Sequence, residues 1–263
     1  MAFKHITSRD NAIFKVIKKL AENARERQKT KQTLLDGVHL IQAYVEVFGE
    51  PTRLIIPEGK STAEATHLMQ QFADVDTLML PTLMFAELSP VTTATGILAL
   101  VNIPQLDIPK NPQCVLMLED IQDPGNLGSM LRTASSAGVD AVFLSTGCTD
   151  VWSPKCLRGG QGAQFLLPVL EKADLQAEIT HFGGQTLAAT MIGESIYSQQ
   201  FSQATAFVIG NEGNGLKAAT IAACTKPVTI PMQSTRQGKM ESLNAGVAAA
   251  VMLFERVRQL GAI

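Results

Sequence analysis

The chain has few of the residues that build disulfide frameworks or metal sites. Its 263 residues include four cysteines and four histidines. The cysteines form no C-x-x-C pair, and the histidines are scattered without the spacing of metal ligands. There is no signal peptide and no run of ~20 apolar residues of the kind that crosses a membrane. These absences indicate a reducing cytoplasm as the default location, and no bound metal is expected.

The chain also lacks the overall positive charge that is typical of nucleic-acid-binding proteins. Its formal net charge is −2 and its pI is near 6.1. The charge is unevenly distributed, because residues 1–31 carry nine Lys or Arg against three Asp or Glu, a balance of +6. Such a stretch can bind RNA phosphates electrostatically, although a solvated helix would have the same composition.

The length favours two domains, since one domain usually takes ~150 residues. Residues 1–103 predict a small α/β domain with short buried strands at 53–57 and 96–102. Residues 104–113 contain three prolines and predict a semi-rigid linker, and residues 114–263 form the second domain. Two helices are predicted in the first domain, from the apolar stripes Ile13, Val16, Ile17, Leu20 and Val38, Ile41, Val45.

A first motif begins the second domain. Cys114–Leu118 is an apolar run of strand length, and Asp123-Pro124-Gly125 has turn chemistry. Asn126 stands where an N-cap is expected, so a helix is predicted to begin near it. Arg132, six residues later, is expected on or near the face that carries Asn126, so that an amide and a guanidinium face one cleft. An ordinary strand-helix unit with a capping Asn and a solvated Arg would have the same pattern.

A second motif is a glycine-rich loop after an apolar strand. Residues 206–216 read AFVIGNEGNGL and hold one carboxylate, Glu212. The order G-x-x-G-x-G reverses the dinucleotide fingerprint, and no G-K-[ST] follows, so neither a nicotinamide-dependent oxidoreductase nor a P-loop enzyme is indicated. The glycines either form a tight strand-to-helix turn or let the backbone approach a flat ligand.

A third motif ends the chain. A short strand is predicted to end at Ile230-Pro231-Met232, and Glu241-Ser242-Leu243-Asn244 begins a long helix. The helix is rich in Ala and Gly, which allows close packing on more than one side. Its apolar stripe consists of Leu243, Val247, Val251 and Phe254.

Together these segments resemble the three motifs of the TrmH/SpoU family of SPOUT RNA 2′-O-ribose methyltransferases. N-L-G-S-M-L-R-T-A, I-G-N-E-G-N-G-L, and I-P-M followed by E-S-L-N occur in the family's order within residues 114–263. The resemblance implies an α/β domain with a mostly parallel sheet, a deep trefoil knot and an S-adenosylmethionine site. Residues 1–103 resemble, more loosely, the family's RNA substrate-binding domain, which is similar to small kink-binding ribosomal proteins. Leu34–Leu40 carries that likeness, with Asp36 where Glu is commoner.

The resemblance implies two sets of site residues. The catalytic set, which would position the ribose and assist methyl transfer, is Asn126, Arg132, Glu212, Ser242 and Asn244. The cofactor-binding set is Ala188, Ala189, Thr190, Gly210, Ile230, Met232 and Leu243. Small and apolar positions suit an adenine, which needs a slot and main-chain hydrogen bonds. The family's proposed base falls on Arg132, but a guanidinium stays protonated at neutral pH, which favours a phosphate clamp over a proton acceptor.

One segment departs from the family pattern. Residues 233–240 form a longer linker than the family usually has, and Arg236 and Lys239 within it either contact RNA phosphates or belong to a solvated basic loop. Arg158, in a turn-rich segment, is a further candidate for RNA contact, although turn structure alone explains that segment.

The sequence therefore predicts a cytoplasmic, S-adenosylmethionine-dependent ribose 2′-O-methyltransferase of structured RNA. Large-subunit (23S-type) rRNA is the favoured substrate because of the two-domain layout. A homodimer with the C-terminal helix at its interface is implied. The alternatives are a tRNA 2′-O-methyltransferase and a catalytically silent RNA-binding or ribosome-assembly protein on the same fold. The intact catalytic set argues against the silent protein, and the long 233–240 linker is compatible with it.

Overall fold

The structure is a computed structural model that describes residues 3–59, 61–89, 95–201, 204–235, 238–239 and 242–261. The chain forms two compact units: Met1–Gln105 with Asp150–Phe165, and Leu106–Thr149 with Leu166–Ile263. The first unit therefore includes a segment, 150–165, that the sequence assigned to the second domain. Likewise, most of the proline-rich stretch predicted as a linker belongs to the second unit.

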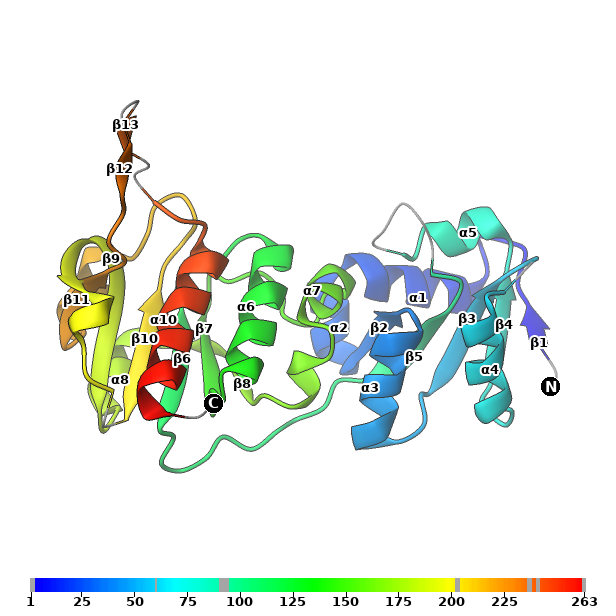
Figure 1. The fold of residues 1–263 in the computed structure, drawn as a ribbon. Coiled ribbons are helices and arrows are strands. Elements are labelled where there is room, and N and C mark those ends of the chain that lie inside the picture. Colours follow the sequence, from blue (N-terminus) through cyan, green and yellow to red (C-terminus); the bar gives the residue numbers. More distant parts are fainter. Residues whose placement is uncertain are drawn as a thin grey trace. The chain divides into compact units, whose positions relative to one another are not determined.

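The first unit is a mixed five-stranded sheet with the strand order β1-β4-β3-β5-β2 (Figure 1). β1 and β3 run parallel to β4, whereas β5 runs antiparallel to both β3 and β2. Its strands are β1 (Phe3–His5), β2 (Gln32–Asp36), β3 (Arg53–Pro57), β4 (Thr77–Leu80) and β5 (Leu98–Asn102). Its helices are α1 (Ala12–Glu22), α2 (Ala24–Thr30), α3 (Val38–Phe48), α4 (Ala63–Gln71), α5 (Thr82–Ala86) and α7 (Pro154–Gly160), with a 3-10 turn at Ala163–Phe165.

The apolar face of α1 differs in one position from the predicted stripe. Phe14, Ile17 and Leu20 are buried against the sheet, at the i, i+3 spacing of one helix face. Val16, which the sequence placed in the stripe, is 48% exposed. Phe14 takes the core position because it lies three residues before Ile17, whereas Val16 points about 100° away from Ile17.

The segment 150–165 is fastened to the first unit by a buried ion pair. Arg27 of α2 donates from Nε to Asp150 Oδ2 at 2.7 Å, and the two side chains are only 4% and 10% exposed. Next to this pair, Thr33 Oγ1 of β2 donates to the Trp152 carbonyl at 2.7 Å. These contacts join residues more than a hundred positions apart, which no local sequence pattern reports.

Replacing Asp150 with alanine is expected to destabilise the first unit by about 3–5 kcal/mol, because it leaves the Arg27 guanidinium buried without its counter-ion. The matched control is Asp76→Ala, which breaks the solvent-exposed Arg53–Asp76 pair of the same unit and should cost less than about 1 kcal/mol. Trp152 is the only tryptophan in the chain, so its fluorescence during urea unfolding follows this unit. Equal midpoints for the two variants would contradict the assigned role.

The second unit is a six-stranded sheet with the order β11-β9-β10-β6-β7-β8, in which every pair is parallel. The strands are β6 (Cys114–Leu118), β7 (Ala141–Ser145), β8 (Val169–Ala173), β9 (Gln185–Ser195), β10 (Thr205–Ile209) and β11 (Lys226–Thr229). β6 and β10 are buried along their whole length, as expected for central parallel strands covered on both faces. The helices are α6 (Pro124–Ser136), α8 (Leu175–His181), α9 (Ala218–Ala223) and α10 (Ala245–Leu260), with a 3-10 turn at Ile196–Ser198.

Two features of this unit frame the functional site. Helices α6 and α10 lie side by side against the sheet, and α10 also contacts β10 (Figure 1). A small antiparallel hairpin, β12 (Ser234–Thr235) with β13 (Gly238–Lys239), projects beyond the carboxyl ends of the strands (Figure 1). This hairpin occupies the segment in which the sequence departs from the family pattern. In the part of the chain that the structure describes, no helix is both long and apolar enough to cross a membrane.

The prediction that Asn126 caps α6 is wrong, because the cap lies three residues earlier in the chain. The helix begins at Pro124, and its N-cap is Asp123, whose Oδ1 accepts the Asn126 backbone amide at 2.8 Å. Proline is favoured at the first helical position because its missing N–H has no partner to lose there, and Asp is a strong N-cap. The Asn126 side chain is therefore free for another contact.

Candidate functional site

The three motif segments meet at one edge of the second unit's sheet. Because β6, β9, β10 and β11 are neighbours and all parallel, their carboxyl ends lie at the same edge. The loop after β6 leads into α6, the loop after β10 holds the glycine-rich motif, and the segment after β11 leads to α10. Ligands of open parallel sheets bind outside this edge, which makes it the candidate site.

A chain of side-chain hydrogen bonds links the three motifs there. Asn244 Nδ2 donates to Asn126 Oδ1 at 3.2 Å, and Asn126 Nδ2 donates to Glu212 Oε1 at 3.1 Å. Glu212 also accepts the backbone amides of Gln122 at 3.1 Å and Asp123 at 3.2 Å. Three of the five predicted catalytic residues are thus brought together, from positions 118 residues apart in the sequence.

Glu212 is held as an anion in this arrangement. Burial raises the pKa of its carboxyl, but the hydrogen bonds from its own backbone amide, from Gln122, from Asn126 and from Asp123 together outweigh burial and bring the pKa below the ordinary 4.5. A carboxylate with a lowered pKa is a weak proton acceptor at neutral pH. Glu212 therefore organises the loop amides and Asn126.

The orientation of both asparagines is determined by α10. Asn244 is the N-cap of this helix, and its Oδ1 accepts the backbone amides of Gly246 at 2.9 Å and Val247 at 3.3 Å. With Oδ1 engaged, its Nδ2 is left to donate to Asn126, whose own Nδ2 then faces Glu212. The start of α10 is thereby tied to the start of α6.

Two substitutions at Asn244 should separate capping from this link. Asn244→Ala loses both and is expected to destabilise the fold by about 1 kcal/mol, with at least a tenfold loss of activity. Asn244→Ser keeps a capping oxygen but has no amide to donate to Asn126, so its stability should stay near that of the unmodified protein while its activity falls as far as in the alanine variant. Thermal unfolding and turnover of both variants test this. A fully active serine variant would show that only the cap matters.

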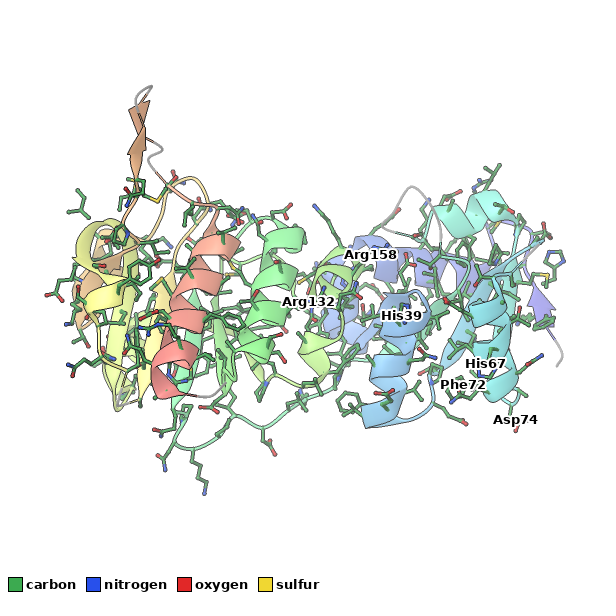
Figure 2. The ribbon with its side chains drawn as sticks, in the orientation of Figure 1. His39, His67, Phe72, Asp74, Arg132 and Arg158 are labelled. Carbon is green, nitrogen blue, oxygen red and sulfur yellow. The ribbon has the colours of Figure 1, made fainter. Side chains whose placement is uncertain are left out.

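Arg132 and Ser242 do not join the hydrogen-bonded chain. Both side chains are exposed, and neither makes a side-chain hydrogen bond or ion pair with a described residue. The expectation that Arg132 shares the face of Asn126 is wrong, because six residues of α-helix place it about 120° around the axis and about 9 Å along it. Its side chain lies on α6 (Figure 2) with its guanidinium available to an external group.

Five of the seven predicted cofactor residues lie within or directly after three adjacent strands. Ala188, Ala189 and Thr190 belong to β9, Gly210 follows β10, and Ile230 follows β11. The pairing of β9 with β11 shifts register, with Ala188 opposite Pro227 but Glu194 opposite Val228. The residues of β9 between them have no ladder partner in β11, and two of their carbonyls, Met191 and Ile192, accept the hydroxyls of Thr229 at 3.3 Å and Thr190 at 2.7 Å.

The chemistry of these positions suits S-adenosylmethionine. None of the seven predicted residues is charged, Ile230 and Met232 are half-buried, and Leu243 is 37% exposed. An apolar slot bordered by main-chain hydrogen-bonding groups is what an adenine ring requires. Of the two explanations for the glycine loop, a tight turn or close approach to a flat ligand, Gly210 supports the tight turn. A Cβ at Gly210 would overlap the backbone of Gly215 and Leu216. Its lack of a side chain serves the turn of the loop.

The remaining predicted contacts are only partly described. Arg236 lies outside the described residues, and for Lys239 only the backbone in β13 is described. Arg158 is half-buried in the last turn of α7 (Figure 2). In the described ranges, no group of three His, Cys, Asp or Glu residues is placed to hold a metal ion. His39 and His67, for example, lie on separate helices, α3 and α4 (Figure 2).

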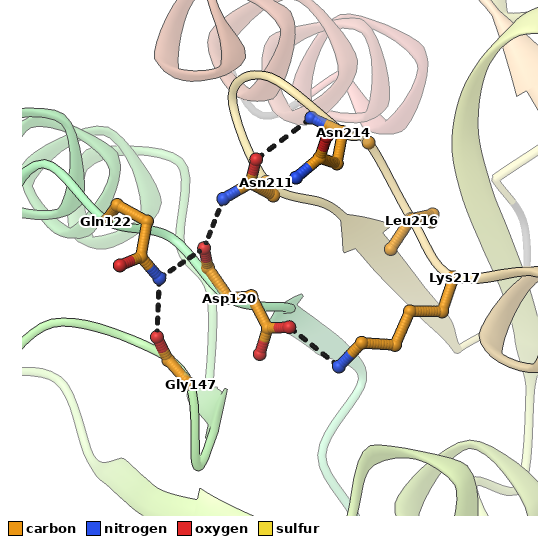
Figure 3. A pocket seen from close by; sticks show the side chains of 8 residues that line it. Asp120, Gln122, Gly147, Asn211, Asn214, Leu216 and Lys217 are labelled. Carbon is orange, nitrogen blue, oxygen red and sulfur yellow. Dashed lines mark hydrogen bonds and ion pairs between the residues drawn. The ribbon is translucent and has the colours of Figure 1, made fainter.

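A second group of polar residues, which the sequence did not single out, lies next to the candidate site (Figure 3). Asp120, at the end of β6, pairs with Lys217 at 2.6 Å, and the neighbouring Glu119 is buried and accepts the Lys217 backbone amide at 2.8 Å. Asp120 and Lys217 line a cavity of about 430 Å³. The only local sign in the sequence is the acidic pair directly after a buried strand, since the partner lysine is about one hundred residues away.

The comparisons with known proteins agree with this geometry. A profile of the SpoU rRNA Methylase family matches residues 113–254. The chain is 32% identical over 263 residues to an uncharacterized tRNA/rRNA methyltransferase of Synechocystis sp., covering 97% of this chain and 93% of that one. It is 30% identical over 265 residues to the 23S rRNA (guanosine(2553)-2′-O)-methyltransferase RlmP of Bacillus subtilis, covering 95% and 98%.

Solved structures extend the likeness to both units. An RNA 2′-O ribose methyltransferase superposes with a TM-score of 0.82 at 28% identity, covering 98% of this chain and 99% of that one. The SpoU methyltransferase AviRb from Streptomyces viridochromogenes, solved in complex with AdoMet, gives 0.81 at 27% identity, covering 96% and 99%.

An all-parallel sheet with the three motifs at its carboxyl edge, together with these likenesses, identifies an α/β RNA methyltransferase that uses S-adenosylmethionine. The chain belongs to the SpoU rRNA Methylase family. The predictions of this family, of the enzyme class and of the cofactor are confirmed, as is an α/β fold with a mostly parallel sheet in the second unit.

Proposed function

We propose that this protein transfers a methyl group from S-adenosylmethionine to a ribose 2′-hydroxyl of large-subunit rRNA. The observation that carries the proposal is the hydrogen-bonded chain Asn244, Asn126, Glu212 at the sheet edge where β9, β10 and β11 end. The relatives named for 2′-O-methylation of 23S rRNA match 95% and 98% of this chain, and therefore both units. That coverage supports rRNA over tRNA.

The site residues divide the work between binding and alignment. S-adenosylmethionine held by the seven cofactor positions supplies an activated methyl group with a neutral leaving group, so no general acid is needed. The protein must align the 2′-oxygen with that carbon, and the hydroxyl proton is released to solvent water as the C–O bond forms and the C–S bond breaks. Asn126 and Asn244, each fixed by two or more hydrogen bonds, provide rigid polar groups for the ribose, and Ser242 adds a hydroxyl beside them. Arg132, whose guanidinium is exposed, clamps a phosphate of the same nucleotide.

The finer features of the fold belong to the same proposal. A deep trefoil knot in the second unit is supported by the strand order, because β11 follows β10 in sequence but pairs with β9, and the chain then returns to α10 beside α6 and β10. The first unit would be the RNA substrate-binding domain, since residues 1–31 with their balance of +6 include α1 and α2.

We also propose a homodimer through α10, acting in the cytoplasm without a metal ion. Val247 and Phe254, seven residues apart on one face of α10, are 49% and 45% exposed, and large apolar side chains gathered on one face favour association. Val247→Glu would place a charge in that stripe, so sedimentation of this variant at the monomer mass is the expected result. An unchanged mass would remove α10 from the interface.

The proposed function is tested by methyl transfer to RNA from cells that lack this protein. Purified protein, total RNA and S-adenosylmethionine with a radiolabelled methyl group are combined, and the RNA is separated by size. Label is expected in large-subunit rRNA. Label in the tRNA fraction alone would overturn the rRNA assignment, and no label in any RNA, with S-adenosylmethionine binding intact, would favour the catalytically silent RNA-binding protein.

A further inference from the structure

The cavity beside the candidate site is separated from it by a single loop. Residues 211–215 line the cavity with Asn211, Asn214 and Gly215, whereas Glu212 in the same loop faces Asn126. Gln122, on the opposite wall, also contacts both the site and the cavity. Its backbone amide donates to Glu212, and its side chain lines the cavity (Figure 3). A ligand in the cavity would therefore lie next to the residues proposed to hold the ribose.

The wall of this cavity is preorganised around Asp120. Asp120 is a non-glycine residue with a φ of 54°, a conformation that other contacts must stabilise. Its carboxylate binds Lys217 at 2.6 Å and Ser145 at 2.8 Å, and its carbonyl accepts Asn211 Nδ2 at 2.8 Å. Gly147 is packed so closely that a Cβ there would overlap the Asp120 carboxylate. The cavity thus exists before any ligand binds.

The lining of the cavity selects against a phosphate. Its one anion, Asp120, is paired with its one cation, Lys217, so the lining residues carry no net charge. The other polar side chains are the amides of Gln122, Asn211 and Asn214, and Leu216 and two glycines supply the rest of the surface. An uncharged ligand with several hydrogen-bonding atoms and a flat apolar face fits this lining.

Two of these amides have hydrogen-bonding capacity left. Gln122 Nε2 donates to the carbonyls of Asp120 and Gly147, at 3.0 and 2.7 Å, which leaves Oε1 without a partner among the described residues. The Asn214 side chain likewise has none, because only its backbone amide is bonded, to Asn211. Such unused amide groups on a rigid wall are what read the edge of an unpaired base.

We propose that this cavity receives an unpaired nucleobase from a nucleotide adjacent to the one that is methylated. The inference rests on the proposed function and names how its substrate is positioned. A volume of about 430 Å³ is within the roughly 300–1,000 Å³ of small-ligand pockets and accommodates one base. The neighbouring base would be held in the cavity, and the target nucleotide would be held by Arg132 and the two asparagines. These two attachments together would fix the position of the target ribose.

The test combines cavity variants with abasic RNA. The variants are Asn214→Ala and Lys217→Gln, whose side chains are exposed. The control is Lys226→Gln on edge strand β11, which breaks a comparable surface pair with Glu194 of β9. The RNA is the fragment found to be methylated, with a single abasic nucleotide at each position flanking the target in turn. With the unmodified protein, one flanking abasic position should lower kcat/KM about tenfold. With intact RNA, the two cavity variants should already show the tenfold lower kcat/KM. With the abasic RNA, their kcat/KM should not fall further.

The control must keep the full kcat/KM with intact RNA and the full sensitivity to the abasic position. Affinity for S-adenosylmethionine, measured by calorimetry, should be unchanged in all variants. Additive losses, or cavity variants as active as the control, would overturn the inference while leaving the proposed function in place. Absence of methyl transfer to any intact RNA would instead refute the proposed function, and the inference with it.

Discussion

Arg132→Ala is expected to lower kcat/KM for methyl transfer at least about 100-fold, the order of loss that follows from misplacing a reacting group by about 1 Å. The fold should be unaffected, because this side chain is exposed and makes no side-chain hydrogen bond or ion pair with a described residue. Affinity for S-adenosylmethionine should also survive, since Arg132 is outside the cofactor set. The measurements are turnover, calorimetric cofactor binding and thermal unfolding of one preparation.

Arg132→Lys distinguishes a phosphate clamp from a proton acceptor. Lysine keeps the charge but loses the planar fork that binds two phosphate oxygens, so the clamp predicts a raised KM for RNA with partial activity. A proton acceptor would improve, because the pKa of lysine, near 10.4, is closer to neutrality than that of arginine. A lysine variant more active than the unmodified protein would refute the clamp, and a fully active alanine variant would remove Arg132 from the mechanism.

Glu212→Ala is expected to cause a loss of activity of similar size, for a different reason. The carboxylate accepts two backbone amides and Asn126, so its removal releases the start of α6 and the glycine loop together. Glu212→Gln preserves the shape and one acceptor oxygen, and it should retain intermediate activity.

The pH dependence separates holding from base catalysis at Glu212. Hydrogen bonds hold the pKa of this carboxyl below 4.5, so the anion is the dominant form throughout neutral pH. The carboxylate stabilises the loop fully at pH values above the ordinary pKa of 4.5, and this stabilisation is lost as the pH falls through the lowered pKa. We therefore expect kcat of the unmodified protein to show no acid limb from Glu212 above about pH 5, by the usual titration width of one group. An acid limb near pH 6 that disappears in Glu212→Gln would identify Glu212 as a base.

The sequence predicted those parts of the site whose signals are local. The apolar strands at 114–118 and 206–209, the glycine loop and the long C-terminal helix each have a pattern within a few residues. Because the strands are parallel neighbours, motifs far apart in sequence meet at one edge, and Asn126, Glu212 and Asn244 are joined as the motif set implies.

The features that the sequence missed depend on contacts between distant residues or on competition between adjacent caps. Asp123 and Asn126 are both good N-caps, and Pro124 decides between them in favour of Asp123. The Arg27–Asp150 pair, which assigns 150–165 to the first unit, joins residues 123 positions apart. The Asp120–Lys217 pair depends on how the loops after β6 and β10 lie against each other. None of these leaves a periodic signal.

The central claim is tested most directly by the chemical identity of the methylated product. RNA labelled by this protein and S-adenosylmethionine is digested to nucleosides, and the labelled nucleoside is identified by mass spectrometry. The account predicts a 2′-O-methylnucleoside, resistant to alkaline cleavage at its 3′ side and derived from large-subunit rRNA. Label on a base, with the ribose unmodified, would contradict the arrangement of Asn126, Arg132, Glu212 and Asn244 as a ribose site.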